Sequence, residues 1–246
     1  MSEKKVALIT GANKGLGFEI ARQLGQKGIT VVVGARDINK AEAAAQKLVD
    51  EGFDAHGVKL EVTSAADIAA LPAFFEKKFG RLDILINNAG VSLDGKDIAA
   101  GGGSKLAVSA DTFRQTYEVN TIAPFEIAKA LLPLLKAAPA GRIVNQSSIL
   151  GSITFISSGQ AGDFLHPAYT SSKAALNMLT TILALELKGT NVKANSVHPG
   201  WVQTDMGGQN APLKVEEGAQ TAVELALIGE DGPTGGFLHL GETLPW

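Results

Sequence analysis

The sequence contains no cysteine, which excludes disulfide bonds and thiolate zinc sites. Its four histidines are scattered without the spacing of metal ligands, so we expect no metal site. No run approaches about 18 uninterrupted apolar residues, and the residues from Met1 to Lys5 include no apolar targeting region. These absences predict a cytoplasmic protein without a membrane span or a signal peptide.

An excess of charge of either sign is also absent. The formal net charge is −3, so nothing in the composition points to nucleic acid or an anionic membrane as a partner. Hydrophobic residues make up 45% of the chain and charged residues 19%, a balance typical of a globular protein with a well-covered core. The length of 246 residues suits one α/β domain, and we expect a single domain spanning 1–246.

The segment from Val6 to Gly17 carries the strongest local signal. Its apolar run ends at Thr10, three glycines follow at Gly11, Gly15 and Gly17, and a helical pattern begins at Phe18. A strand, a glycine turn and a helix in this order present free N–H groups and a helix N-terminus to a phosphate. The glycine spacing is not G-x-G-x-x-G, so an ordinary turn between strand and helix is the alternative.

Strands and helices alternate along the rest of the chain. The expected strands after the first are residues 29–35, 56–60, 82–86, 142–145, 192–197 and 236–240. The expected helices after the first are residues 39–51, 64–79, 111–136, 169–187 and 215–228. This alternation predicts an α/β fold with one doubly wound parallel sheet of about seven strands and helices on both faces.

Two stretches interrupt the pattern. Residues 92–110 lose periodicity and include a run of three glycines, so we expect either a mobile surface loop near the site or a neutral insertion. Pro124 and Pro133 should kink or interrupt the helix expected over 111–136.

In a doubly wound sheet, ligands bind beyond the carboxyl ends of the strands, where the strand order reverses. The segments expected there are the glycine turn, Arg36, Glu61-Val62, Asn87 to Gly90, Ser147-Ser148 and His198-Pro199-Gly200-Trp201. Tyr169 and Lys173 are four residues apart and share a face of the helix expected there. The pair alone is weak evidence, because two solvated side chains can have the same spacing, but it occurs together with these other features.

The combination resembles the short-chain dehydrogenase/reductase family of the single-domain kind, and within it the carbonyl-reductase-like members. The resemblance covers essentially the whole chain, in order, through Thr10 to Gly17, Asn87-Asn88-Ala89-Gly90, Asn120, Ser148, Tyr169 to Lys173, Pro199 to Met206 and Pro233 to Phe237. It implies a Rossmann fold and hydride transfer between a nicotinamide cofactor and a carbonyl/alcohol pair.

The resemblance also implies a catalytic tetrad. Its members are Asn120, Ser148, Tyr169 and Lys173. Tyr169 would exchange a proton with the substrate oxygen, and Ser148, rather than Ser147, would orient the carbonyl. Lys173 would hold the cofactor ribose and lower the pKa of Tyr169; at ~4 Å and an effective dielectric of ~20, it would favour the phenolate by about 4 kcal/mol. Asn120 would support a water-linked proton path to the lysine.

The end of the second strand predicts the cofactor. An acidic residue there binds the ribose 2′-hydroxyl of NAD, whereas an arginine accommodates the 2′-phosphate of NADP. Arg36 occupies this place and Lys14 adds positive charge in the glycine turn, so we expect NADP(H). Glu61 stands where the family usually has an aspartate facing the adenine, so the backbone of Val62 is the alternative contact. The expected cofactor-binding residues are Gly11, Asn13, Lys14, Gly15, Leu16, Gly17, Arg36, Glu61, Val62, Asn88, Ala89, Gly90, Tyr169, Lys173, Pro199, Gly200, Val202 and Thr204.

The expected substrate wall is largely apolar and consists of Ser148, Ile149, Leu150, Phe164, Tyr169, Trp201 and Met206. A wall without a charged clamp predicts a broad carbonyl reductase acting on ketones and aldehydes of moderate size. The alternatives are an alcohol, sterol or 3-oxoacyl-thioester dehydrogenase with the same tetrad, and an NADP-binding regulator without catalysis.

Ser148 and Tyr169 are 21 positions apart, a longer interval than is common in the family. The extra residues within 151–166 can bring Phe164 or His166 near the substrate. A larger insertion at this place accompanies a monomeric state in some carbonyl reductases. Because this insertion is smaller, we expect a homodimer or homotetramer, with a monomer as the alternative.

Overall fold

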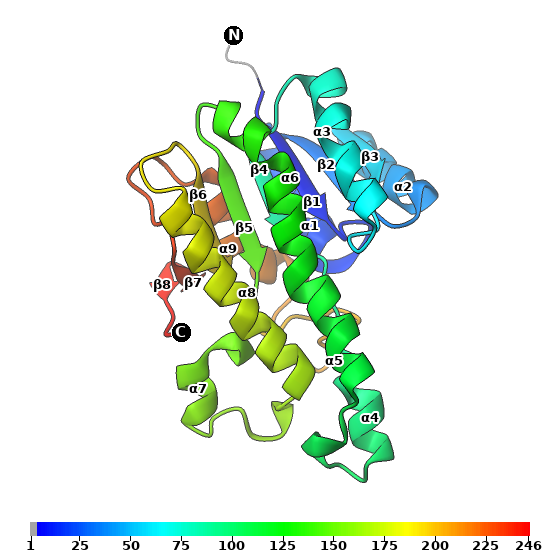
Figure 1. The fold of residues 1–246 in the computed structure, drawn as a ribbon. Coiled ribbons are helices and arrows are strands. Elements are labelled where there is room, and N and C mark those ends of the chain that lie inside the picture. Colours follow the sequence, from blue (N-terminus) through cyan, green and yellow to red (C-terminus); the bar gives the residue numbers. More distant parts are fainter. Residues whose placement is uncertain (1–3) are drawn as a thin grey trace.

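An eight-stranded sheet forms the centre of the computed structural model, which describes residues 4–246 (Figure 1). The strands are β1 (Val6–Thr10), β2 (Thr30–Ala35), β3 (Ala55–Lys59), β4 (Ile84–Asn87), β5 (Arg142–Gln146), β6 (Lys193–Val197), β7 (Phe237–His239) and β8 (Glu242–Thr243). Their order is β3-β2-β1-β4-β5-β6-β7-β8, and only the pairing of β7 with β8 is antiparallel. The doubly wound parallel sheet is confirmed, and the short β8 is an addition to the predicted strands.

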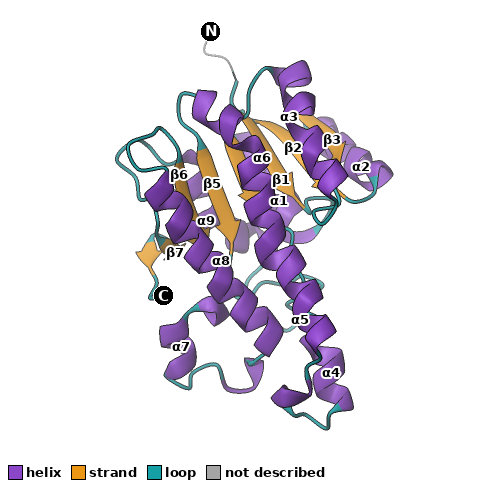
Figure 2. Ribbon diagram, in the orientation of Figure 1, coloured by secondary structure: helices purple, strands orange, loops and turns teal. Residues whose placement is uncertain are grey.

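Helices cover both faces of the sheet (Figure 2). They are α1 (Gly15–Gln26), α2 (Ile38–Asp50), α3 (Ala65–Phe79), α4 (Asp94–Ala100), α5 (Ala110–Tyr117), α6 (Ala123–Ala137), α7 (Ile153–Ser157), α8 (Pro167–Glu186) and α9 (Val215–Leu227). One hydrophobic cluster packs α1, α2 and α9 on one face, and a second packs α3, α6 and α8 on the other. The strands are continuous apolar runs because both of their faces are buried. Within residues 4–246, no helix combines the length and apolar character needed to span a membrane.

The strand order reverses between β1 and β4. The neighbour of β1 on one side is β2, and β4 lies on its other side. Successive crossovers from this point run in opposite directions along the sheet, so the carboxyl ends of β1 and β4 border the crevice where such folds bind ligands. The glycine turn follows β1, and the segment from Asn88 to Gly90 follows β4.

Residues 92–110 do not form the mobile surface loop that was one of the two expectations from the sequence. They form α4 and a short 3₁₀ turn (Lys105–Ala107), and the Asp97 carboxylate accepts hydrogen bonds from Ser109 N at 2.8 Å and Thr112 Oγ1 at 2.7 Å. The segment is ordered by such side-chain contacts rather than by an apolar periodicity, which is why the periodicity did not predict it.

The helix expected over 111–136 is interrupted ahead of both prolines. A π-helical segment (Glu118–Ile122) separates α5 from α6. Pro124 lies in the first turn of α6, where a missing N–H costs no helical hydrogen bond. Pro133 lies within α6 without ending it, contrary to the expectation that both prolines would disturb the helix.

Candidate active site

The turn between β1 and α1 requires each of its three glycines. Gly11 and Gly15 have φ angles of +62° and +58°, a region that favours glycine. A Cβ on Gly17 would lie 2.4 Å from Asn88 Nδ2 and 2.9 Å from Gly11 O. Lys14 begins α1 without a side-chain cap, so the first turn of the helix is available to an anion. Asn13, Lys14, Gly15 and Leu16 lie on the accessible side of the turn, whereas Gly17 is buried against β4.

The segment after β4 is held against this turn. Thr10 Oγ1 accepts hydrogen bonds from the backbone N–H groups of Asn88 and Ala89, each at 3.0 Å. Asn88 Nδ2 donates to Thr10 O at 2.8 Å. A Cβ on Gly90 would lie 3.4 Å from both Asn120 Oδ1 and Lys173 Nζ. The glycine turn and two members of the predicted tetrad are thereby brought to the same edge of the sheet.

Ser148, Tyr169 and Lys173 converge at the carboxyl end of β5. Tyr169 and Lys173 lie one turn apart on α8, and Lys173 Nζ is 5.7 Å from the centroid of the Tyr169 ring. The ammonium donates to Gln146 O at 2.7 Å, which holds Lys173 at the end of β5. Ser148 follows two residues later, and its Oγ accepts a hydrogen bond from Leu150 N at 3.2 Å.

Burial dominates the titration of the pair. Burial raises the pKa of the Tyr169 phenol, and a hydrogen bond with Ser148 opposes that shift. Burial lowers the pKa of Lys173 from its usual 10.5 to about 8. Removal from water disfavours the phenolate, and the Lys173 ammonium is directed at the Gln146 carbonyl. The expected lowering of the Tyr169 pKa by Lys173 stays a prediction.

Asn120 lies in the π-helical segment and is fully buried. Its Nδ2 donates to Val91 O at 2.8 Å and to Ser172 Oγ at 3.0 Å, and its Oδ1 accepts from Val91 N at 2.8 Å. The side chain therefore joins the segment after β4 to α8, next to Lys173. Its expected part in a proton path stays a prediction.

The charged groups after β2 and β3 differ in their availability. Arg36 is exposed, and within residues 4–246 it has no ion-pair partner. Asp37 caps α2 by accepting from Asn39 N at 2.9 Å, so its carboxylate is engaged. Glu61 Oε1 accepts from the Thr63 hydroxyl at 3.3 Å, which turns it toward its own loop, while Val62 is buried beside it. Arg36 is thus the free charge at the end of β2.

The loop after β6 closes against the glycine turn. Gly200 has a φ of +85°, which lets the chain turn beyond Pro199. Val202 is buried, and the Thr204 methyl group lies 3.9 Å from the position of a Cβ on Gly15. Lys14 forms an ion pair with Asp205 of this loop, a partner that the cofactor prediction did not include.

Most of the predicted substrate wall is accessible to solvent. Phe164 and Trp201 are 37 residues apart in sequence, but their rings meet edge to face at 5.3 Å. Phe164 is 56% exposed, Trp201 45% and Met206 52%, so these apolar groups face outward rather than into the core. Ile149 and Leu150 follow Ser148 directly in a short 3₁₀ turn (Ile149–Gly151). His166 Nδ1 is 3.1 Å from Ser92 Oγ, so this histidine is not a free loop residue.

Two buried polar residues at the site escaped the sequence-based prediction. Asp94 is fully buried, and its carboxylate accepts from Ala168 N at 2.7 Å and from Tyr169 N at 3.1 Å. Gln146 is buried, and its side-chain amide has no hydrogen-bond partner among the described residues. An aspartate in an aperiodic stretch carried no signal of its own, but a glutamine ending an apolar strand was a detectable irregularity.

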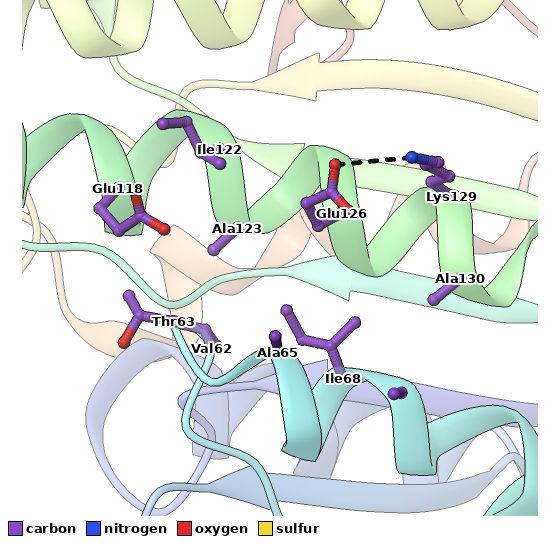
Figure 3. A pocket seen from close by; sticks show the side chains of 11 residues that line it. Val62, Thr63, Ala65, Ile68, Glu118, Ile122, Ala123, Glu126, Lys129 and Ala130 are labelled. Carbon is purple, nitrogen blue, oxygen red and sulfur yellow. Dashed lines mark ion pairs between the residues drawn. The ribbon is translucent and has the colours of Figure 1, made fainter.

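A separate hollow of about 290 Å³ lies between α3 and α6 (Figure 3). Its lining is mostly apolar, with an ion pair at its rim between Lys129 and Glu126 at 3.9 Å. It shares only Val62 with the predicted site residues. The chemistry-bearing side chains gather instead beyond the carboxyl ends of β1, β4, β5 and β6.

These features fit a dinucleotide. The glycine turn has no room for side chains where it packs on Asn88, and the adjoining helix start is uncapped, as a pyrophosphate requires. The buried side-chain amide of Gln146, at the end of β5, has no hydrogen-bond partner among the described residues. A polar group of a ligand could supply one. A nicotinamide cofactor has anionic and polar amide groups that match these two features.

Known proteins support this reading. A family model described as short chain dehydrogenase matches residues 5–213. Carbonyl reductase (NADPH) 1 of Mus musculus is 34% identical, with 100% of this chain and 99% of the mouse protein aligned. (+)-Neomenthol dehydrogenase of Arabidopsis thaliana is 33% identical over 95% of each chain. The structure of NADPH bound carbonyl reductase from chicken fatty liver matches with a TM-score of 0.86 and 31% identity, over 99% of this chain and 100% of that one.

The family match spans the glycine turn and the tetrad residues in order, and the relatives extend over nearly the whole chain. The chicken structure shares this fold, with a TM-score of 0.86, and it is also related in sequence, at 31% identity. The chain belongs to the short chain dehydrogenase family.

Proposed function

We propose that the protein reduces ketones and aldehydes to alcohols with NADPH, in one catalytic and cofactor-binding unit spanning 1–246. The observation that carries this proposal is the convergence of Ser148, Tyr169 and Lys173 at the carboxyl end of β5, beside the glycine turn. The names of two relatives add support, because the mouse and chicken proteins are carbonyl reductases described with NADPH.

Reduction adds a hydride to the carbonyl carbon and a proton to its oxygen. The bound cofactor supplies the hydride. Tyr169 donates the proton, and its raised pKa keeps the phenol protonated at neutral pH. The Ser148 hydroxyl holds the carbonyl oxygen as negative charge develops on it. The Lys173 ammonium stabilises the phenolate that remains after proton transfer, and Asn120 supports the proton's replacement by holding α8 in place.

The charges at the adenosine end favour NADP(H). Arg36 is available to the 2′-phosphate, whereas one oxygen of the Asp37 carboxylate is already engaged in the cap of α2. The Glu61 carboxylate is turned onto Thr63, so the backbone of Val62 remains the contact for the adenine. The unpartnered Gln146 amide would meet the nicotinamide half of the cofactor.

The same residues can run the reaction backward, and the Arabidopsis relative is named a dehydrogenase. Alcohol oxidation needs Tyr169 as a phenolate base, and burial disfavours that form. The protonation state of Tyr169 at neutral pH therefore favours reduction over oxidation.

An exposed apolar stripe supports the expected homodimer or homotetramer. Met178, Ile182 and Leu185 follow one another at intervals of four and three residues on α8 and are 62%, 49% and 67% exposed. Ile122, just before α6, and Phe125, in its first turn, are also exposed. Apolar side chains gathered in this way are typical of a surface that another chain covers.

A spectrophotometric screen tests the activity. Loss of NADPH absorbance is followed with aromatic ketones, aldehydes, keto-esters and a 3-oxoacyl thioester. We expect turnover of ketones and aldehydes, reduced by about a thousandfold in Tyr169→Phe, which keeps the ring and removes the proton donor. A strong preference for the thioester would favour the thioester dehydrogenase. If the protein binds NADPH but turns over no substrate, and Tyr169→Phe changes nothing, the non-catalytic regulator is favoured.

A further inference from the structure

His198 connects the two loops that the proposed function places on either side of the reacting groups. It follows β6 directly, and its Nδ1 accepts a hydrogen bond from Ile149 N at 3.2 Å and a longer one from Gly200 N at 3.4 Å. Ile149 is the residue after Ser148, and Gly200 belongs to the predicted cofactor loop. One imidazole nitrogen thus joins the serine turn to the loop after β6.

This contact continues the pairing of β5 with β6 past the end of the strands. The strands pair through Gln146 and Val197, and the last backbone bond runs from Ser147 N to Val197 O at 2.8 Å. Beyond that point, the His198 side chain supplies the acceptor for Ile149 N. The position of Ile149, the residue after Ser148, is thereby fixed relative to β6.

The two amides that follow Ser148 are both engaged. Ile149 N donates to His198, and Leu150 N donates to the Ser148 hydroxyl oxygen at 3.2 Å. The second bond occupies a lone pair of that oxygen, which leaves the hydroxyl hydrogen for the substrate or Tyr169. Without the first bond, the turn could rotate about Ser148 and carry the hydroxyl away from Tyr169.

The imidazole can act only as an acceptor at Nδ1. An N–H donor points at this nitrogen, so the ring must be neutral with its proton on Nε2. Burial, reinforced by neighbouring His239, lowers the pKa of His198 to about 3, so the neutral ring persists at any pH at which the enzyme would work. His239 packs at 4.9 Å from the ring and donates from Nδ1 to His198 O at 2.8 Å, which fixes the backbone behind it.

We infer that His198 is a positioning residue for carbonyl reduction, which holds the Ser148 hydroxyl in register with Tyr169 by accepting the Ile149 N–H. This inference rests on the proposed role of Ser148. His198 touches neither the tetrad side chains nor the reacting atoms in the described contacts, so its effect passes through the backbone of the serine turn.

Three variants isolate the acceptor. His198→Leu removes it, whereas His198→Asn places an amide oxygen near the position of Nδ1. Ile149→Pro removes the donor instead, at the first position of a helical turn where proline is tolerated, after a serine whose extended backbone suits the residue before proline. We expect His198→Leu and Ile149→Pro to lower kcat by about ten- to a hundredfold. His198→Asn should recover most of the rate, and the Kd of NADPH should change less than threefold in all three.

A double-mutant cycle with Ser148→Ala decides between positioning and general stability. If His198 acts through Ser148, His198→Leu lowers kcat in the parent protein and has no further effect in the Ser148→Ala background. Equal losses in both backgrounds, or full kcat in His198→Leu while Ser148→Ala is impaired, would overturn the inference alone. Full activity of Ser148→Ala would overturn the proposed function and the inference with it. Amide hydrogen exchange at Ile149, slow in the parent and fast in His198→Leu, gives a readout independent of turnover.

Discussion

Tyr169 and Lys173 show how burial shapes a proton-transferring pair. Lys173 is buried and Tyr169 is half-buried, and each is pushed toward its neutral form: the pKa of the phenol rises and that of the ammonium falls to about 8. A neutral phenol is the form that can donate a proton to a carbonyl oxygen. Lys173 is then the member of the pair that titrates near neutral pH.

The pH dependence of reduction follows from these shifts. Lys173 is protonated below its pKa of about 8 and loses its charge above it, while Tyr169 keeps its proton throughout. We expect kcat/KM for ketone reduction to be flat from about pH 6 to 8 and to fall about tenfold per unit at higher pH. A pH–rate profile measured at saturating NADPH checks this. Lys173→Met should abolish the inflection, and a profile in Lys173→Met with the same midpoint as the parent would assign it to another group.

Arg36 should set the choice of cofactor. Replacing it with aspartate removes the positive charge facing the 2′-phosphate and adds a repulsive one, so we expect the ratio of kcat/KM for NADPH over NADH to fall by about a hundredfold or more. Steady-state kinetics with both cofactors measure the ratio. Lys47→Asp, an equal change of charge at the exposed far end of α2, is the matched control and should leave the ratio unchanged. Equal efficiency of the parent enzyme with both cofactors would contradict the assignment.

At the scale of elements, α4 has a defined task. The buried Asp94 carboxylate receives the N–H groups of Ala168 and Tyr169, which the start of α8 leaves without intrahelical partners. The negative charge also lies at the positive end of the helix dipole. The residues from Asp94 to Ala100 therefore anchor the helix that carries Tyr169 and Lys173.

Removal of this cap should weaken both stability and turnover. We expect Asp94→Ala to lower the free energy of unfolding by about 2 kcal/mol, because two buried N–H groups lose their acceptor. Asp94→Asn retains one acceptor oxygen and should lose about half as much. Urea denaturation followed by circular dichroism measures both, and kcat should follow the same order. An Asp94→Ala protein as stable as the parent would contradict the capping role.

At the scale of the whole molecule, the reversal of strand order decides where the site lies. Loops after β1, β4, β5 and β6 reach one edge of the sheet, although β1 ends at Thr10 and β6 ends at Val197. The apolar stripe lies instead on the exposed side of α8, which covers one face of the sheet. The proposed active site and the proposed interface would thus use different surfaces.

Assembly can be tested on that stripe. We expect the parent protein to elute as a dimer or tetramer, and a Met178→Glu/Leu185→Glu double variant to elute as a monomer, because two charges would be buried at the interface. Size-exclusion chromatography with light scattering measures the mass. Lys188→Glu, an exposed change just beyond α8, should keep the parent mass. A monomeric parent protein would support the alternative drawn from the insertion before α8.

Sequence alone determined the sheet, its glycine turn and the identity of the residues that gather at its edge. Local signals suffice for these, because buried parallel strands are apolar runs and phosphate turns need glycine. Tertiary structure decided what depends on distant partners. It showed that Asp94 caps α8, that the His198 side chain accepts the Ile149 N–H after Ser148, that Asp205 pairs with Lys14, and that burial raises the Tyr169 pKa. Each depends on groups brought together across the fold, and on their removal from water, which no run of residues encodes by itself.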